Sequence, residues 1–170
     1  MGLFDKLTGT KRPGNGAVPR SAEEVRAALL GLNGPDVPYV VRYGGPEGAS
    51  LVAEWRIQEP AWQTFFARTQ VSLALQVQMR LVPADHTVRA LDRQWQVTWA
   101  GDTPKLALSA EASRGQVTMV SRRWTIGRGA EGGLEATETF RFDSSELKGP
   151  LQDAVLAAGW TWRGVVYGKL

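Results

Sequence analysis

The apolar residues have helical spacing near the start of the chain and strand spacing over most of the rest. From Val25 to Leu32 they recur at every third or fourth position, as on one face of a helix. Ser21 and Glu24 have the spacing of a capping box, in which each residue binds a backbone N–H at the start of a helix. The pattern therefore predicts an amphipathic helix over 21–32.

Beyond this helix apolar and polar residues alternate, which is typical of strands that bury one face. The alternation is clearest over 71–82, and residues 87–99 follow after a short turn, so we expect these two strands to pair antiparallel. Within 87–99 the apolar phase changes, and we expect a β-bulge near 90–93, because one extra residue re-aims every later side chain. The other expected strands are 37–43 and 51–57 as one hairpin, 105–111 and 116–126 as another, 134–142, and 160–167.

Two further helices are expected, over 60–68, where Pro60 suits the first position, and over 150–158, which is apolar nearly all round. Every link between strands is short or contains one short helix, which favours antiparallel pairing. The predicted fold class is α+β and mainly antiparallel β: about eight strands in a curved sheet or open barrel, an N-terminal amphipathic helix and a buried C-terminal helix. An open sheet with helices on one face is the alternative.

The first twenty residues differ in composition from the rest of the chain. Residues 1–20 are rich in Gly and Pro and contain four basic residues and one acidic residue, whereas residues 21–170 contain sixteen of each sign. The pI of 9.5 therefore reflects the first segment, and a folded nucleic-acid module, which needs a basic face, is disfavoured. We expect 1–20 to be a flexible basic arm that can be deleted without loss of folding, and 21–170 to be a single globular β-rich domain.

The arm contains the residues that we expect to contact a partner. Leu3, Phe4 and Leu7 lie on one side of a helical turn, and Lys11 and Arg12 follow nearby. Apolar residues beside basic ones suit a weak contact with an anionic membrane surface. A docking peptide for a partner protein is an equal alternative, and the pattern leaves the oligomeric state open.

Composition excludes several kinds of site. The chain has no cysteine and one histidine, which rules out disulfides, thiolate chemistry and cysteine-bound metals, so we expect no metal and no cofactor. No apolar run approaches the roughly 20 residues that span a bilayer, and no secretory signal opens the chain, so we expect a cytoplasmic protein. Fifteen arginines against five lysines suit a GC-rich bacterial source.

Three patterns suggest chemistry but have simpler explanations. The letters of the dinucleotide fingerprint G-x-G-x-x-G occur at 127–132, but strand-like residues follow where a helix is needed, so a hairpin loop is expected. His86 and Asp85 lie on a turn, where exposed polar residues collect. An acid–base pair would require the fold to bring together two of the scattered carboxylates, which are Glu54, Asp92, Glu111, Glu135 and Glu138.

Seven tryptophans are unusual for this length. Most lie in phase with other apolar residues, which favours core packing, and a pocket lined by some of these rings is the functional alternative. The sequence contains no catalytic motif and we assign no catalytic residue. We therefore expect a non-catalytic binding or scaffold module, with a carrier of a small apolar ligand between sheet and helix, or an enzyme with scattered acidic residues, as the alternatives.

Overall fold

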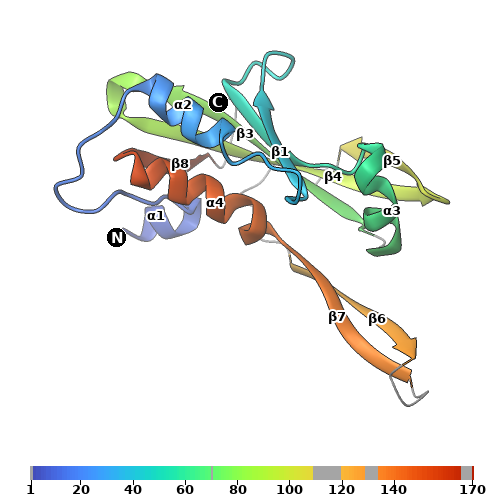
Figure 1. Cartoon of the computed structure of the whole chain (residues 1–170). Helices are drawn as coiled ribbons and strands as arrows, with labels where there is room; N and C mark the ends of the chain where they lie inside the picture. Colours follow the sequence, from blue (N-terminus) through green and yellow to red (C-terminus); the bar gives the residue numbers. More distant parts are fainter. Residues whose placement is uncertain (1, 70, 109–119, 129–133, 166–169) are drawn as a thin grey trace.

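The core of the structure is a curled sheet (Figure 1). This computed structural model describes residues 2–69, 71–108, 120–128, 134–165 and 170, with the backbone alone described at 69, 108, 120–128 and 134–144. The sheet consists of β1 (Tyr39–Tyr43), β2 (Leu51–Trp55), β3 (Leu73–Val82), β4 (Thr87–Ala100), β5 (Thr103–Leu108) and β8 (Thr161–Val165). The first five strands pair antiparallel in the order β1-β2-β3-β4-β5, so the predicted α+β, mainly antiparallel fold class is confirmed.

Helices and a separate hairpin make up the other described elements. The helices are α1 (Leu3–Thr8), α2 (Ala22–Leu30), α3 (Pro60–Thr69) and α4 (Ser144–Ala157), with a 3₁₀ turn, η1 (Pro83–Asp85), between β3 and β4. The hairpin is β6 (Val120–Arg128) with β7 (Leu134–Asp143), which leads directly into α4. Among these described helices, none is both long and apolar enough to cross a membrane.

The predicted helix over 21–32 is present as α2, and its capping box forms. Glu24 N–H donates to Ser21 Oγ at 3.2 Å, and Ser21 N–H donates to the Glu24 carboxylate at 2.9 Å. Val25 and Leu29, one turn apart, are fully buried. Figure 1 shows α2 and α4 lying across the same side of the sheet, and they contact each other there.

The pairing of β3 with β4 confirms the expected central hairpin, but the expected bulge near 90–93 is wrong. Ten consecutive residue pairs run from Leu73↔Gln96 to Val82↔Thr87 without a shift in register. The apolar residues shift from even to odd positions because the first part of β4 buries one face and the last part buries the opposite face. Val88 and Ala90 are buried on the face that α2 and α4 cover, whereas Val97 is buried on the opposite face, where β4 pairs with β5.

Two other expectations about the sheet need correction. β8 pairs with β4 in parallel, from Thr87↔Thr161 to Leu91↔Val165, because α4 carries the chain back to the same end of the sheet before β8 begins. The expected hairpin of 105–111 with 116–126 falls partly outside the described residues. Within the described part, β5 pairs with β4 and β6 pairs with β7.

The helix α4 begins six residues earlier than expected and contains Pro150 in its interior. Proline lacks the N–H that would bind the carbonyl of Glu146, which weakens a helix at that turn. The helix continues because its inner side is firmly packed: Leu147, Leu151 and Val155 are all fully buried. Burial of these side chains offsets the lost backbone bond.

One buried ion pair joins this helix to the sheet. Asp92, on the helix-covered face of β4, has a fully buried side chain, and Lys148 Nζ of α4 donates to its Oδ2 at 2.6 Å. A carboxylate at such a position needs a counter-charge because burial without one is costly. Lys148 therefore fixes α4 against β4 at a defined point.

We predict that Lys148→Met lowers the free energy of unfolding by about 3–5 kcal/mol, because it removes the cation that faces a buried carboxylate. Denaturant unfolding measures this change, and Lys105→Met, at an exposed position on β5, is the matched control. The double variant Asp92→Leu with Lys148→Met should recover much of the loss, since neither charge is then buried. A single variant as stable as the control would contradict this role of the ion pair.

Candidate functional site

A cleft of about 510 Å³ opens on the side of the sheet that α2 and α4 leave uncovered. Most of its lining comes from strand residues whose side chains point away from those helices, as the registers of β1 to β5 require. The segment between β2 and α3 forms one rim. The lining residues are Val40, Arg42, Glu54, Trp55, Arg56, Ile57, Gln58, Glu59, Ala74, Leu75, Gln76, Trp95 and Leu106.

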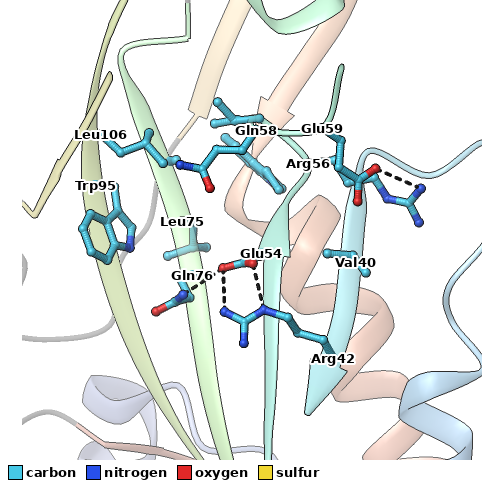
Figure 2. A pocket seen from close by; sticks show the side chains of 13 residues that line it. Val40, Arg42, Glu54, Arg56, Gln58, Glu59, Leu75, Gln76, Trp95 and Leu106 are labelled. Atoms are coloured by element: carbon cyan, nitrogen blue, oxygen red, sulfur yellow. Dashed lines mark hydrogen bonds and ion pairs between the residues drawn. The ribbon is translucent and has the colours of Figure 1, made fainter. Parts of the chain in front are cut away.

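A ladder of polar side chains crosses the floor of the cleft (Figure 2). Arg42 Nε donates to Glu54 Oε1 at 2.9 Å, and Gln76 Nε2 donates to Glu54 Oε2 at 2.8 Å. Gln78 Nε2 continues the ladder by donating to Gln76 Oε1 at 3.0 Å. Glu54 lies directly opposite Gln76 in the β2–β3 register, so antiparallel pairing itself brings these side chains together.

Arg42 also binds Glu47, in the turn between β1 and β2. Its Nη1 donates to Glu47 Oε2 at 3.1 Å, so a single guanidinium joins two carboxylates. The hydrogen bonds to Glu47 and then to Glu54 raise the pKa of Arg42 further above its ordinary value. The same contact with Arg42 lowers the pKa of Glu47. Arg42 and Glu47 are therefore both charged at neutral pH.

The arginines at the cleft also close the free edge of the sheet. Arg42 Nη1 donates to the carbonyl of Tyr43 at 3.2 Å, and Arg56 Nε donates to that of Tyr39 at 2.9 Å. Between them, the Asn33 side chain accepts from Val41 N–H at 2.7 Å and donates to Val41 O at 2.8 Å. Edge strands with free backbone groups promote aggregation, and here side chains occupy the outward groups of β1.

One wall of the cleft is apolar. Trp95 on β4 lies directly opposite Ala74 on β3, and Leu106 on β5 lies beside it. Figure 2 shows the Trp95 ring and Leu106 on one side of the cleft, with the Glu54–Arg42 pair across from them. Trp95 is half-buried, so part of its ring is open to a ligand. Such a wall beside a polar floor suits a ligand that is apolar on one side.

The charges in the cleft lining balance. Two arginines, Arg42 and Arg56, are matched by Glu54 and by Glu59, which lies 3.6 Å from Arg56. Both oxygens of Glu54 already accept hydrogen bonds, one from Arg42 and one from Gln76. In the described part of the chain, no three His, Asp or Glu side chains gather as a metal site would require. The arrangement is suited to holding a ligand.

The N-terminal residues expected to contact a partner lie together on α1 and just after it. Leu3, Phe4 and Leu7 are exposed, as are Lys11 and Arg12. Arg12 lies 3.4 Å from Asp5 and lines a smaller hollow, of about 340 Å³, between α1 and β8. Their role as partner contacts remains a prediction.

The segment 1–20, expected to be a flexible arm, makes backbone contacts with the rest of the domain. Lys11 and Trp162 exchange both backbone hydrogen bonds, each at 2.8 Å, so Lys11 extends the sheet beyond β8. Trp160 Nε1 donates to the carbonyl of Arg20 at 2.8 Å, and Arg20 N–H donates to Ala158 O. Composition missed these contacts because backbone groups make them, whatever the side chains.

The fold separates the other residues that suggested chemistry. Glu54 and Asp92 lie on opposite faces of the sheet, while the side chains of Glu135 and Glu138 and all of Glu111 lie outside the described residues. His86 is exposed in a left-handed turn conformation, and its ring meets that of Trp160 edge-on at 5.7 Å. The G-x-G-x-x-G letters end outside the described residues, after β6 and before β7, so antiparallel strands flank them.

The tryptophans divide between core and cleft. Trp160 and Trp162 are among the largest fully buried side chains, and Trp55 is buried against Phe66. Trp55 and Trp95 line the cleft, as the alternative of an aromatic-lined pocket had suggested. The side chain of Trp124 lies outside the described residues. The polar groups that line the cleft with Trp95 were not recognised from sequence, since Gln76 and Glu54 are 22 residues apart and meet only through strand pairing.

The chain matches no known family model, no curated protein and no solved structure.

Deleting residues 1–20 should lower the melting temperature by several degrees, since it strips backbone partners from Trp162 and the ring partner from Trp160. The flexible-arm expectation instead predicts an almost unchanged melting temperature. A shorter deletion of residues 1–7, which keeps the Lys11–Trp162 pairing, should cost much less. Equal melting temperatures for the full chain and the longer deletion would show that these contacts contribute nothing.

The contribution of Glu47 to stability should depend on pH. Because Arg42 lowers its folded pKa, the stability it adds is present above the unfolded value of 4.5 and is lost as the pH falls through the folded value. Glu47→Gln should cost about 0.5–1 kcal/mol at pH 7, as expected for a partly exposed pair. Denaturant unfolding at pH 7 and at about pH 3 should show the cost shrinking, and Asp153→Asn, at an exposed position on α4, should show no such trend.

Proposed function

We propose that the protein is a non-catalytic binding module whose ligand occupies the 510 Å³ cleft on the uncovered face of the sheet. The observation that carries this proposal is that the ionised groups of the cleft satisfy one another. Arg42 joins Glu54 and Glu47, while Arg56 lies beside Glu59. A ligand that enters therefore meets a fixed, neutral, hydrogen-bonding surface. Ligand pockets commonly combine a few oriented polar groups with an apolar wall.

The expected ligand is a small ring-containing organic molecule without net charge. Its ring face would lie against Trp95 and Leu106, and its hydrogen-bonding groups would meet Gln76 and Gln58. A charged ligand would have to disrupt an existing ion pair in order to find a counter-charge, which lowers its affinity. The size of the cleft is within the range of ligand pockets, roughly 300–1,000 Å³.

The two alternative functions receive less support from this geometry. A carrier of a purely apolar ligand would have to cover the partly exposed ion pair of Arg42 and Glu54, and withdrawing paired charges from water is costly. An enzyme using scattered acidic residues needs a carboxyl that is able to exchange a proton. Glu54 and Glu59 are both engaged with arginines instead.

The proposal extends to the finer architecture and to the setting. We infer that, of about eight strands, the six of the main sheet form an open barrel around a buried C-terminal helix, so that the helix-covered side supplies stability and the other side supplies the site. The Arg-rich, cysteine-free composition supports a bacterial, cytoplasmic protein.

Native mass spectrometry of the protein taken directly from its source tests the proposal. We expect a co-purifying small molecule, and we expect Trp95→Ala to weaken its binding by about tenfold or more, because truncation of a central aromatic contact costs at least about 1–2 kcal/mol. Tyr43→Ala is the matched control, since Tyr43 is an exposed ring outside the cleft. Thermal melting of both variants separates a lost contact from a lost fold.

Two outcomes would count against the cleft as the site. In the first, the co-purified molecule binds equally well to Trp95→Ala and to the control. In the second, neither a co-purified molecule nor a panel of neutral ring compounds changes the tryptophan fluorescence of the wild-type protein.

A further inference from the structure

The short helix α1 presents its apolar side to solvent and its polar side to the protein. Leu3, Phe4 and Leu7 are 78%, 70% and 67% exposed, whereas Thr8 on the inner side is only 5% exposed. Helices on a protein surface normally have the opposite orientation, with the apolar side inward. The orientation of α1 therefore leaves a contiguous apolar stripe, Leu3-Phe4-Leu7, available to something outside the chain.

This orientation is fixed by contacts on both sides of the helix end. Thr8 Oγ1 lies 2.6 Å from Thr10 Oγ1 in a buried hydrogen bond, and Thr8 Oγ1 also donates to the carbonyl of Phe4 at 3.0 Å. Lys11 then pairs with Trp162 in the sheet. Thr8 and Thr10 are buried and Lys11 is fixed to the sheet, so turning the stripe inward would expose the two threonines or break the pairing with Trp162.

We infer that α1 is an interfacial anchor that inserts the Leu3-Phe4-Leu7 stripe into the surface of an anionic lipid bilayer. Charge supports this occupant. Lys6 lies on the exposed side of α1, and Lys11 and Arg12 follow it, against Asp5 alone. Residues 21–170 contain equal numbers of acidic and basic residues, so the net positive charge of the protein is concentrated in the segment that carries the exposed apolar stripe. Apolar side chains flanked by basic ones are typical of helices that lie in the membrane interface.

A bilayer suits this stripe better than a protein groove does. Helices that dock into protein grooves use anchors spread over at least two turns, at spacings of i, i+3 or i+4, and i+7, whereas α1 has six residues. A stable protein interface buries about 800 Å² on each partner, which is far more than three side chains supply. A bilayer has no such minimum area. Binding would be weak and reversible, and it is independent of the cleft.

Vesicle co-sedimentation of the full chain tests the anchor. We expect binding to phosphatidylcholine vesicles that contain about one quarter phosphatidylglycerol, and little binding to pure phosphatidylcholine vesicles. Raising the salt concentration from about 0.1 M to 1 M should weaken the binding, because the screening length falls from about 10 Å to about 3 Å.

Single substitutions locate the contact. Phe4→Ser should reduce partitioning about tenfold, since Phe4 would supply much of the inserted apolar area. Val18→Ser is the matched control, because Val18 is 82% exposed but lies outside α1. Lys6→Glu should abolish the preference for anionic vesicles. All three side chains are exposed, so the melting temperature should stay unchanged and confirm that each variant is folded.

Each of several results would overturn the anchor. These are no binding of the wild-type protein to anionic vesicles, equal binding to neutral and anionic vesicles, or equal loss in Phe4→Ser and Val18→Ser. Self-association without vesicle binding, removed by Phe4→Ser, would identify the stripe as a protein interface instead.

Discussion

The uninterrupted pairing of β3 with β4 is the constraint on which the rest of the structure depends. Ten residue pairs without a bulge keep every side chain of these strands on a fixed face. Val77 and Met79 therefore lie with Ala90 and Asp92 under the helices, while Gln76 and Trp95 must point to the other side. The same register that builds the core thus places the floor and the apolar wall of the cleft on the uncovered face.

The two faces of the sheet are stabilised by different interactions. On the helix-covered face, apolar burial dominates, and a buried ion pair between Asp92 and Lys148 connects α4 to β4. On the uncovered face, the charged groups are partly exposed and stabilise one another through Arg42. Arg42 and Arg56 also occupy outward carbonyls of β1, so the cleft and the protected edge of the sheet depend on the same two side chains.

The N-terminal segment pairs with β8. Its backbone continues the sheet at Lys11, which is independent of side-chain polarity, so its apolar side chains are free to face outward. A segment whose composition suggests flexibility can therefore be held by backbone pairing alone. Backbone pairing at Lys11 therefore holds the segment in place, while the apolar side chains of α1 face solvent.

The amino-acid sequence by itself determined the elements whose signals are local. The capping box at Ser21 and Glu24, the helix beginning at Pro60 and the alternation over 71–82 each appear where the pattern predicted, because side-chain spacing within one element decides which face it buries. Tertiary structure decided the features that depend on distant residues. The phase change in β4 reflects which partner covers each face, the parallel placement of β8 follows from the path of α4, and the Arg42–Glu54–Gln76 ladder requires three strands in register. No local pattern encodes these contacts, since each one joins residues that approach only when the sheet has formed.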